Sequence, residues 1–412
     1  MKILWVKSGG LLPPDTGGKI RSLNLLRELA KLHAVDLFTF YPRLADDPHH
    51  TLGSMVSKAV YEPMDIAEAG TLGDYAHYAR NLLSSRPYSA AKYCRPEIAQ
   101  KLRAWLEKQR YDLILCDFLL TAGVIPWDVE VPKVIFTHNV EAQIWKRHFQ
   151  VSKPGLWKAV AWREFKTMDA MERRYLRLAD GVLTVSENDK TQFSEFVPRE
   201  RLAVIPTGVD IDYFRPQAEG PRPNTLVFTG SMDWTPNQDA ILYFAEAILP
   251  KIQKELGDAS LWVVGRKPSE RLKELARKLP GIHVTGAVDD IRPYIARSAV
   301  YVVPIRIGGG TRIKIYEAMA MGKPVVSTTV GAEGLPVENG RDLFLEDDPE
   351  RFAAVVVQLL RSPRLSRQLG EAARRLVETS YSWAAVAGEL AETLERFQAG
   401  HAQKDELAHA GR

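Results

Sequence analysis

The first forty residues read MKILWVKSGGLLPPDTGGKIRSLNLLRELAKLHAVDLFTF, and their pattern decides the fold class. An apolar run at 3–6 is followed by a helical spacing of apolar residues over 20–32 and by a second β-rich run at 35–40. A buried strand, a helix and another buried strand in this order are typical of a βαβ unit. We therefore predict an α/β protein with a parallel sheet covered by helices.

The same alternation of apolar runs and helical segments continues along the chain in two series. The first series adds strand-like runs at 112–115, 134–137 and 181–185. A loop-like stretch rich in breakers over 207–224 interrupts it, and the second series follows at 226–228, 261–264, 283–284, 300–303 and 324–326. Since a single core stops growing near ~250–300 residues, a chain of 412 residues is expected to form two Rossmann-like domains. We place these domains at 1–207 and 208–381, followed by a terminal helix and polar tail at 382–412.

Composition narrows the class of protein. Lys and Arg total 55 against 51 Asp and Glu, and the resulting formal charge of +4 does not suit a nucleic-acid-binding protein. The two cysteines, Cys94 and Cys116, lack the spacing of a zinc site or redox pair. No apolar stretch approaches the ~20 residues of a membrane-spanning helix, and the first run is shorter than a signal-peptide core. We therefore expect a cytoplasmic protein that binds no nucleic acid and does not cross a bilayer.

Two glycine-rich turns are candidates for phosphate binding. One lies at 8–19 and leads into a helix expected from about Ile20, and the other is Gly308-Gly309-Gly310-Thr311-Arg312-Ile313-Lys314. At the carboxyl ends of parallel strands, such turns let backbone N–H groups and helix dipoles meet phosphates. In the second turn the glycines permit close approach and Arg312 and Lys314 supply positive charge, so a diphosphate fits. The alternative for this turn, taken alone, is a flexible surface loop with solvated charges.

The second turn continues into Glu317-Ala318-Met319-Ala320-Met321-Gly322-Lys323-Pro324, in which a carboxylate stands on a helix that stops at Gly-Lys-Pro before a strand. The whole string resembles the donor-binding signature of the family 4 glycosyltransferases. Further similarities occur in family order at 185–187, 204–210, 214–216, 228–231, 284–290 and 331–334. The resemblance therefore spans most of the chain.

The resemblance implies the GT-B fold, in which two Rossmann-like domains face each other. The acceptor would bind mainly to 1–207 and the nucleotide-sugar donor to 208–381, and the helix at 382–412 would cross back to the first domain. The implied activity is that of a retaining hexosyltransferase, which moves a sugar from a nucleotide diphosphate-sugar to a saccharide, lipid-linked or small-molecule acceptor. Such a reaction would serve glycan, polysaccharide or glycoconjugate biosynthesis. Two alternatives stay open: a nucleotide-sugar epimerase of the same fold, and a non-catalytic sugar-nucleotide-binding subunit.

A set of site residues follows from the resemblance. Glu317 would accept hydrogen bonds from ribose hydroxyls, while Arg312 and Lys314 would neutralise the departing diphosphate. His138 follows a strand-like run and would contact the sugar in the cleft, the alternative being a structural histidine that caps the next segment. The implied catalytic residues are His138, Arg312 and Lys314. The implied donor-binding residues are Gly17, Gly18, Gly230, Val288, Gly309, Gly310, Thr311, Arg312, Lys314 and Glu317.

Two positions depart from the family pattern. The family often carries a Glu where this chain has Gly309, and that carboxylate usually contacts hydroxyls of the donor sugar. Backbone N–H groups of 308–311 are the expected substitute. Many relatives place an Arg after the glycine at 230, whereas this chain has Ser231.

Metal dependence is not expected from the sequence. The acidic pairs at 46–47, 289–290 and 347–348 lack the intervening residue of a paired-carboxylate metal motif, and they occur in contexts typical of turns and helix starts. If Arg312, Lys314 and helix dipoles compensate the charge of the leaving group, the reaction needs no divalent cation. The nucleotide diphosphate-sugar is then a substrate, and no cofactor is required.

A basic stretch at 145–177 carries nine Lys and Arg residues against three acidic ones, with Trp145, Trp157 and Trp162 interleaved. Basic residues combined with interfacial tryptophans suit peripheral contact with an anionic membrane, here at the inner face. A solvated helical face with buried aromatics is the alternative.

Overall fold

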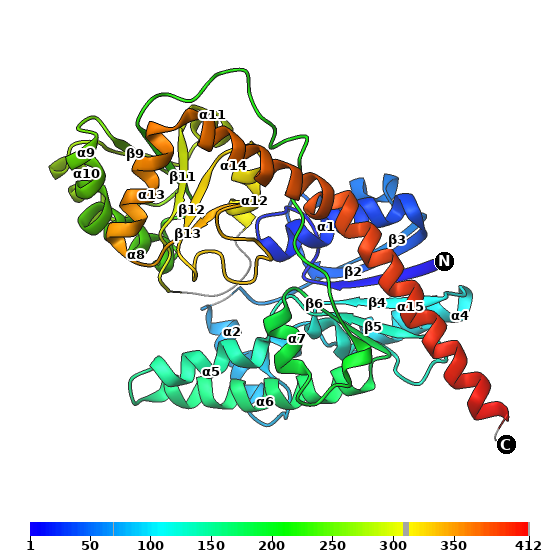
Figure 1. Ribbon diagram of the computed structural model, residues 1–412. Coiled ribbons are helices and arrows are strands. Elements are labelled where there is room, and N and C mark those ends of the chain that lie inside the picture. The colour runs from blue at the N-terminus through cyan, green and yellow to red at the C-terminus, as the bar shows by residue number, and fades with distance from the viewer. Residues whose placement is uncertain (69, 308–312, 411–412) are drawn as a thin grey trace. The chain divides into compact units, whose positions relative to one another are not determined.

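The computed structural model describes residues 1–68, 70–307 and 313–410 (Figure 1). The chain divides into two compact units. Unit 1 comprises Met1–Pro206 with Val386–Arg412, and unit 2 comprises Thr207–Ala385. Residues 382–385 stay with unit 2, where Ser382 forms a parallel bridge with Val209.

Unit 1 contains a parallel sheet of seven strands in the order β3-β2-β1-β4-β5-β6-β7. The strands are β1 (Lys2–Ser8), β2 (Ala34–Pro42), β3 (Lys58–Met64), β4 (Leu113–Asp117), β5 (Lys133–Phe136), β6 (Gly181–Thr184) and β7 (Leu202–Val204). The central strands are apolar and buried because helices cover both faces of a parallel sheet. The helices are α1 (Gly17–Leu32), α2 (Leu72–Asn81), α3 (Tyr88–Ala91), α4 (Pro96–Lys108), α5 (Glu141–Val151), α6 (Leu156–Leu178) and α7 (Glu187–Phe193).

The first helix begins earlier than the sequence pattern indicated. Helix α1 starts at Gly17 rather than near Ile20, because the side chain of Thr16 accepts a hydrogen bond from the backbone N–H of Lys19 and caps the helix. The prediction that Gly17 and Gly18 belong to a turn is therefore wrong, since both residues lie in the first turn of α1.

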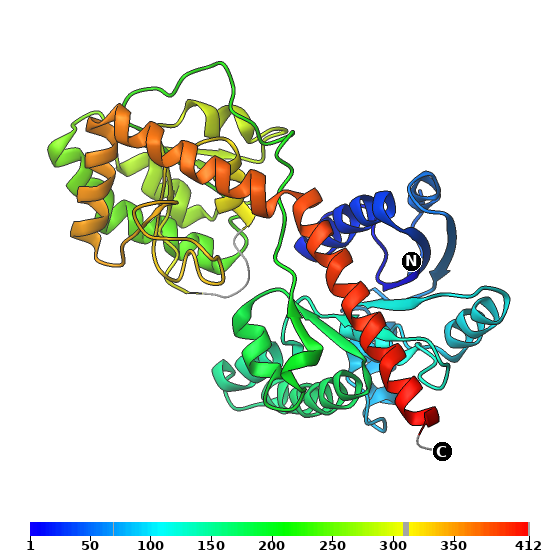
Figure 2. The same cartoon turned by 45° about the vertical axis from the view of Figure 1, so that its right-hand side comes forward.

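Helix α15 (Trp383–Ala410) enters unit 1 from Val386 onward (Figure 2). Its buried residues recur at helical spacing and include Val386, Leu390, Leu394 and Phe397. The ring of Phe397 occupies the space that a side chain at Gly181 would need, because a Cβ there would lie 2.2 Å from the ring. Glycine at the start of β6 thus lets α15 pack onto the sheet of unit 1.

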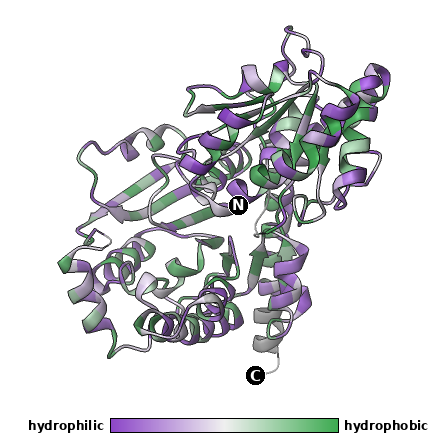
Figure 3. Ribbon diagram, turned by 90° about the vertical axis from the view of Figure 1, so that its left-hand side faces the viewer, coloured by the Kyte–Doolittle hydropathy of each residue, from purple (hydrophilic) through white to green (hydrophobic). Residues whose placement is uncertain are grey.

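Unit 2 contains six parallel strands in the order β10-β9-β8-β11-β12-β13. The strands are β8 (Thr225–Thr229), β9 (Ser260–Val264), β10 (Ile282–Gly286), β11 (Val300–Val303), β12 (Val325–Ser327) and β13 (Phe344–Leu345). The helices are α8 (Thr235–Tyr243), α9 (Leu249–Glu255), α10 (Glu270–Lys278), α11 (Arg292–Arg297), α12 (Ile313–Ala320), α13 (Pro349–Arg361) and α14 (Pro363–Leu376). Figure 3 shows the hydrophobic residues concentrated on the strands and the hydrophilic ones on outward faces of the helices.

In both sheets the direction in which successive strands are added reverses once. This reversal marks the place where a ligand site is expected. In unit 1 the chain builds outward from β1 to β3 and then returns to place β4 beside β1. In unit 2 it builds from β8 to β10 and returns to place β11 beside β8. Loops diverge beyond the carboxyl ends of the two strands at such a switch point, and this opening is where doubly wound sheets bind ligands. Among the described helices, none is long and apolar enough to span a membrane.

Candidate functional site

The switch point of unit 2 lies between β8 and β11, and its loops carry most of the predicted donor-binding residues. Gly230 directly follows β8, while Lys314 and Glu317 lie on α12 after β11. The residues Gly308, Gly309, Gly310, Thr311 and Arg312 lie outside the part of the chain that the structure describes.

Gly230 permits a close approach between α12 and the loop after β8. Its φ of +154° is one that side-chain-bearing residues rarely adopt, and a Cβ at this position would lie 2.6 Å from Lys314 Nζ. The same Cβ would lie 2.7 Å from Asn237 Nδ2. A second glycine, Gly265 after β9, approaches so closely that its Cβ would lie 1.8 Å from the carbonyl oxygen of Gly230. A side chain at Gly265 would therefore force a backbone shift, and at Gly230 the φ itself disfavours a side chain.

Lys314 places its charge directly against this turn. Its Nζ donates to Asn237 Oδ1 at 2.9 Å and lies 4.1 Å from the ring centroid of Phe228, a cation–π arrangement. Glu317 stands three residues further along α12. Burial raises the pKa of Glu317 to about 7, although the charge of Lys314 opposes the shift. Glu317 is partly buried, and a carboxylate with a raised pKa at a switch point indicates a functional site.

The sequence analysis missed two cations of this site, Arg266 and Lys267. Both follow β9 and Gly265, and Arg266 Nε donates to Ser231 Oγ at 2.9 Å. The position after Gly230, where the family pattern has an Arg, thus has a guanidinium from the neighbouring strand instead. A strand followed by glycine and two cations at 260–267 was the available signal.

Val288 is a described donor-site candidate of unit 2, but it lies apart from this cluster. It follows the edge strand β10, which β9 separates from β8. Its side chain is partly buried and packs against the hydrophobic core of unit 2.

The switch point of unit 1 lies between β1 and β4 and brings His138 together with Asp117. His138 Nε2 lies 2.7 Å from Asp117 Oδ1, at the end of β4. Burial lowers the pKa of His138 to about 4, although Asp117 opposes the shift. Burial would raise the pKa of Asp117, but the charge of Lys7 and the contact with His138 hold it at about 2. The pair is therefore an ionised carboxylate that accepts a hydrogen bond from the Nε2–H of a neutral imidazole.

The remaining nitrogen of His138 also has a partner. Arg21 Nη1, from α1, lies 3.5 Å from His138 Nδ1, and His138 itself is only 5% exposed. The ring stacks on Phe118 with centroids 4.1 Å apart. The sequence predicted a polar side chain that enters a cleft, whereas within unit 1 His138 is a buried member of a polar network. Its contact with a sugar stays a prediction.

Phe118 contacts several members of this network, and its own backbone is strained. Its φ of +75° is an unusual value for a side-chain-bearing residue and costs about 1–3 kcal/mol. Lys7 Nζ lies 3.9 Å from the centroid of its ring. A Cβ at Gly18 would lie 2.8 Å from Phe118 Cζ, so glycine lets the start of α1 pack on this ring. Gly17, one residue earlier, is exposed at the first position of the helix.

The acidic pairs that the sequence analysis discussed have partners of their own. Asp290 accepts from the backbone N–H of Arg292, Asp347 accepts from Thr329, and Asp348 caps α13. Across the described ranges, no group of three or more His, Cys, Asp or Glu side chains could hold a metal ion.

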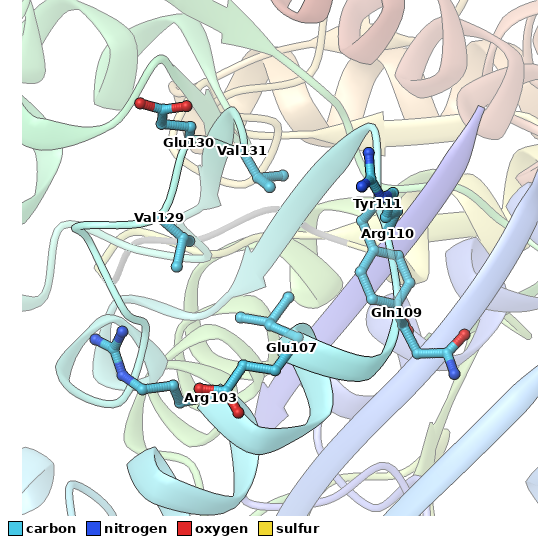
Figure 4. A pocket seen from close by; sticks show the side chains of 9 residues that line it. Arg103, Glu107, Gln109, Arg110, Tyr111, Val129, Glu130 and Val131 are labelled. Atoms are coloured by element: carbon cyan, nitrogen blue, oxygen red, sulfur yellow. The ribbon is translucent and has the colours of Figure 1, made fainter.

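A hollow of about 380 Å³ in unit 1 lies away from the switch point (Figure 4). It is lined by the end of α4, by Arg110 and Tyr111 before β4, and by 129–131. These residues precede the strands, whereas ligands of doubly wound sheets bind beyond the carboxyl ends. Its lining also contains charges of both signs, such as Arg103 and Glu107, which lie one turn apart on α4. We therefore assign this hollow no part in the reaction.

Comparisons with known proteins agree with this architecture. The model of Glycosyltransferase Family 4 matches residues 16–213, and the model of Glycosyl transferases group 1 matches residues 223–362. Together the two models cover most of the chain. The chain belongs to the family 4 glycosyltransferases.

Two relatives are mannosyltransferases. The chain is 28% identical over 263 residues to the MMP alpha-(1->4)-mannosyltransferase of Mycolicibacterium hassiacum, covering 61% of this chain and 62% of the relative. It is 30% identical over 262 residues to the GDP-mannose-dependent alpha-(1-6)-phosphatidylinositol monomannoside mannosyltransferase of Mycobacterium tuberculosis, covering 57% and 66%. The chain thus spans less than two thirds of the length of these relatives.

The similarity in fold to a solved structure extends over nearly the whole chain. The sucrose-phosphate synthase of Thermosynechococcus elongatus superposes with a TM-score of 0.68 at 18% identity, covering 97% of this chain and 100% of that structure. The two parallel-sheet units form the GT-B fold that was expected.

Proposed function

We propose that the protein is a glycosyltransferase of the hexosyltransferase class that moves a sugar from a nucleotide diphosphate-sugar to an acceptor. The observation that carries this proposal is the cluster of Gly230, Lys314 and Glu317 at the switch point of unit 2. These three groups suit a nucleoside diphosphate. The glycine lets a phosphate approach the backbone, the lysine beside it supplies positive charge, and the carboxylate lies one helical turn away.

Each member of this cluster has a distinct proposed role. Lys314 and Arg266 would stabilise the diphosphate, whose charge grows as it leaves, so their effect is larger in the transition state than in the ground state. Glu317 would accept hydrogen bonds from the ribose hydroxyls, because a carboxylate can accept two donors at once. Since these cations compensate the leaving group, we propose that turnover needs no divalent metal. EDTA should leave the rate unchanged, and loss of activity that Mg²⁺ or Mn²⁺ restores would contradict this.

We further propose that transfer retains the configuration at the anomeric carbon. The acceptor oxygen would form its bond to that carbon on the face from which the diphosphate departs, and a phosphate oxygen would take the acceptor's proton. The family resemblance motivates this step. Early-time proton NMR of the product would test it, since the anomeric coupling of the product should match that of the donor. Inverted coupling would contradict retention.

The activity itself can be tested without knowing the acceptor. Release of nucleoside diphosphate is measured from GDP-mannose, the donor in a relative's name, and from a panel of UDP-sugars, with saccharide or lipid-extract acceptors. Lys314→Met should lower turnover by roughly 10–100-fold, since a hydrogen bond to a charged group contributes about 1.5–3 kcal/mol. Lys254→Met, at an exposed position on α9, is the matched control.

Two other outcomes would point to the alternatives. Conversion of the donor sugar to its epimer in acceptor-free buffer would identify an epimerase. Binding of nucleotide sugar without turnover in any mixture would favour a non-catalytic subunit.

We also propose that the α5–α6 hairpin contacts an anionic membrane surface. The exposed apolar side chains Leu156, Trp157 and Trp162 accompany exposed Lys146 and Lys153 on this hairpin. Tryptophans beside lysines suit the interface of an anionic bilayer.

The segment after helix α2 adds two exposed leucines beside α6. Arg163 on α6 donates to the backbone carbonyl oxygens of Asn81 and Ser84, which holds the end of α2 beside α6. Leu82 and Leu83 are exposed at the same place. Arg163 is therefore held by contacts within the protein, and the exposed Lys146 and Lys153 would meet the lipid.

Sedimentation with vesicles tests the membrane proposal. Wild-type protein should sediment with vesicles containing phosphatidylglycerol and remain free with phosphatidylcholine alone. Leu156→Ser should weaken sedimentation, while Leu32→Ser, an exposed leucine on α1, should not. Equal behaviour of the two variants would reject the hairpin as the contact surface.

A further inference from the structure

The loop between β1 and α1 is held at its start by a buried histidine, His49. This residue begins the 3-10 turn His49–Ser54 after β2 and is 1% exposed. Its Nε2 accepts hydrogen bonds from two consecutive backbone N–H groups, those of Leu11 at 3.1 Å and Leu12 at 3.2 Å. Two loop amides thus converge on one ring nitrogen.

The other side of the ring fixes the tautomer. His49 Nδ1 lies 2.7 Å from Asp47 Oδ1, and Tyr41 donates its hydroxyl to Asp47 Oδ2 at 2.6 Å. A carboxylate oxygen can only accept, so Nδ1 carries the proton and Nε2 is left as the acceptor that the loop requires. The imidazole also stacks on Tyr41 with centroids 3.7 Å apart, which fixes its orientation.

The approach of loop to histidine depends on glycine. Gly10 has a φ of +73°, and a Cβ there would lie 2.7 Å from His49 Nε2 and 3.0 Å from Tyr41 Cβ. The loop then runs to Thr16 and α1, where Gly18 packs on Phe118 in the His138 network. The loop is thus fixed at one end by His49 and at the other by that network.

We infer that His49 is a positioning residue, which sets the conformation of the glycine-rich loop and so presents the start of α1 at the unit 1 switch point. The link to catalysis rests on the proposed function, while the positioning of the loop does not. His49 touches no reacting atom in this scheme and acts through the backbone of 11–12.

The charge state of His49 makes the positioning of this loop depend on pH. Burial lowers the pKa of His49, the hydrogen bond and charge of Asp47 oppose the shift, and Lys19 adds to it. Tyr41, which stacks on the ring, stays protonated because burial and Asp47 raise its pKa. The imidazole is therefore neutral at pH 7. The pKa of His49 is lower in the folded protein than in the unfolded chain. The neutral ring therefore contributes its full stabilisation of the folded protein above about pH 6.5, the ordinary pKa of histidine. This contribution is lost as the pH falls through the pKa of His49 in the folded protein. A proton on Nε2 would face two N–H donors.

Amide hydrogen exchange of the full chain tests the inference, with mass-spectrometric readout of a peptide spanning 9–16. His49→Leu should speed exchange at Leu11 and Leu12 by tenfold or more, and His49→Gln should restore part of the protection because its amide can accept. His50→Leu is the matched control, since His50 is the exposed neighbour. Slow exchange in the β1 peptide would show that each variant is folded.

Unchanged exchange in 9–16 on replacing His49 with Leu would overturn the inference. If that variant does not fold, the wild-type protein provides the test. After correction for intrinsic exchange, protection of 9–16 should decrease as the pH falls below the ordinary histidine pKa of about 6.5 and through the lowered pKa of His49. Protection that stays constant over this fall in pH would contradict the role of His49. Neither readout needs a substrate, so failure to find turnover would reject the proposed function and leave this result standing. Where turnover is found, kcat/KM should fall for His49→Leu and stay unchanged for His50→Leu.

Discussion

Replacing Glu317 with Gln removes a carboxylate whose charge changes near neutral pH. Burial raises its pKa to about 7 against the opposing charge of Lys314. We expect the ionised form to bind the ribose hydroxyls of a nucleoside diphosphate, because it can only accept. Around a pKa near 7, the ionised fraction rises from about one tenth at pH 6 to about nine tenths at pH 8.

The size of the effect follows from these fractions. If only the ionised form binds, the Kd of wild-type protein falls about tenfold between pH 6 and pH 8, which corresponds to about 1.4 kcal/mol. A terminal phosphate also loses a proton near pH 6, and that contribution is common to wild type and variant. The ratio of the two Kd values therefore isolates Glu317.

Isothermal titration with GDP and with UDP at pH 6, 7 and 8 measures this ratio. It should grow about tenfold in favour of wild type across the range. Glu371→Gln, at an exposed carboxylate on α14, should keep a constant ratio to wild type. A ratio for Glu317→Gln that does not change with pH would refute the assignment of this carboxylate to the ribose.

Three further predictions address stability and packing. Because the pKa of Glu317 is raised on folding, its ionisation opposes folding. The protonated carboxyl contributes its full stabilisation of the folded protein below about pH 4.5, and this contribution is lost as the pH rises through 7. Glu317→Gln should thus have a higher Tm than wild type at pH 8 in circular dichroism, with a difference that shrinks toward pH 4; a constant difference would contradict this sign. Gly230→Ala should weaken diphosphate binding at least tenfold in titration, since backbone strain costs about 1–3 kcal/mol, whereas Gly257→Ala, with open space around it, should bind normally. Phe397→Ala should lower the free energy of unfolding by about 3–5 kcal/mol in urea titrations, while the exposed Glu392→Ala should have little effect, and equal losses would reject the packing of α15 onto β6.

The fold could be predicted because its signals are local. The apolar run at 3–6 and the helical spacing at 20–32 specify strand, helix and parallel strand within forty residues. The same pattern at 226–228 indicated the second sheet, and the structure confirms the α/β class and the GT-B architecture.

The sites were only partly predictable, because strand order determines which loops meet. Lys314 and Glu317 share a short segment with a recognisable pattern, so sequence alone indicated them. Asp117 looked like an ordinary residue at the end of a strand until β4 was seen to pair with β1 near His138. Arg266 reaches Ser231 only because β9 pairs with β8.

The apolar periodicity also could not predict where helix α1 is capped. The apolar spacing that suggested a helix from Ile20 does not register Thr16, whose hydroxyl starts α1 at Gly17. His49 carried no signal in sequence, since its partners Leu11 and Leu12 belong to a loop almost forty residues earlier.

The central claim is that the switch point of unit 2 binds a nucleoside diphosphate, and a thermal-shift panel of nucleoside diphosphates and nucleotide sugars tests it most directly. A ligand that binds only the native state raises its stability by about 2.7 kcal/mol at a hundredfold excess over Kd. We predict a clear rise in Tm with one nucleoside diphosphate and its sugars, strongly reduced in Lys314→Met and preserved in Lys254→Met. No rise with any member of the panel, or a rise that Lys314→Met leaves intact, would contradict the account.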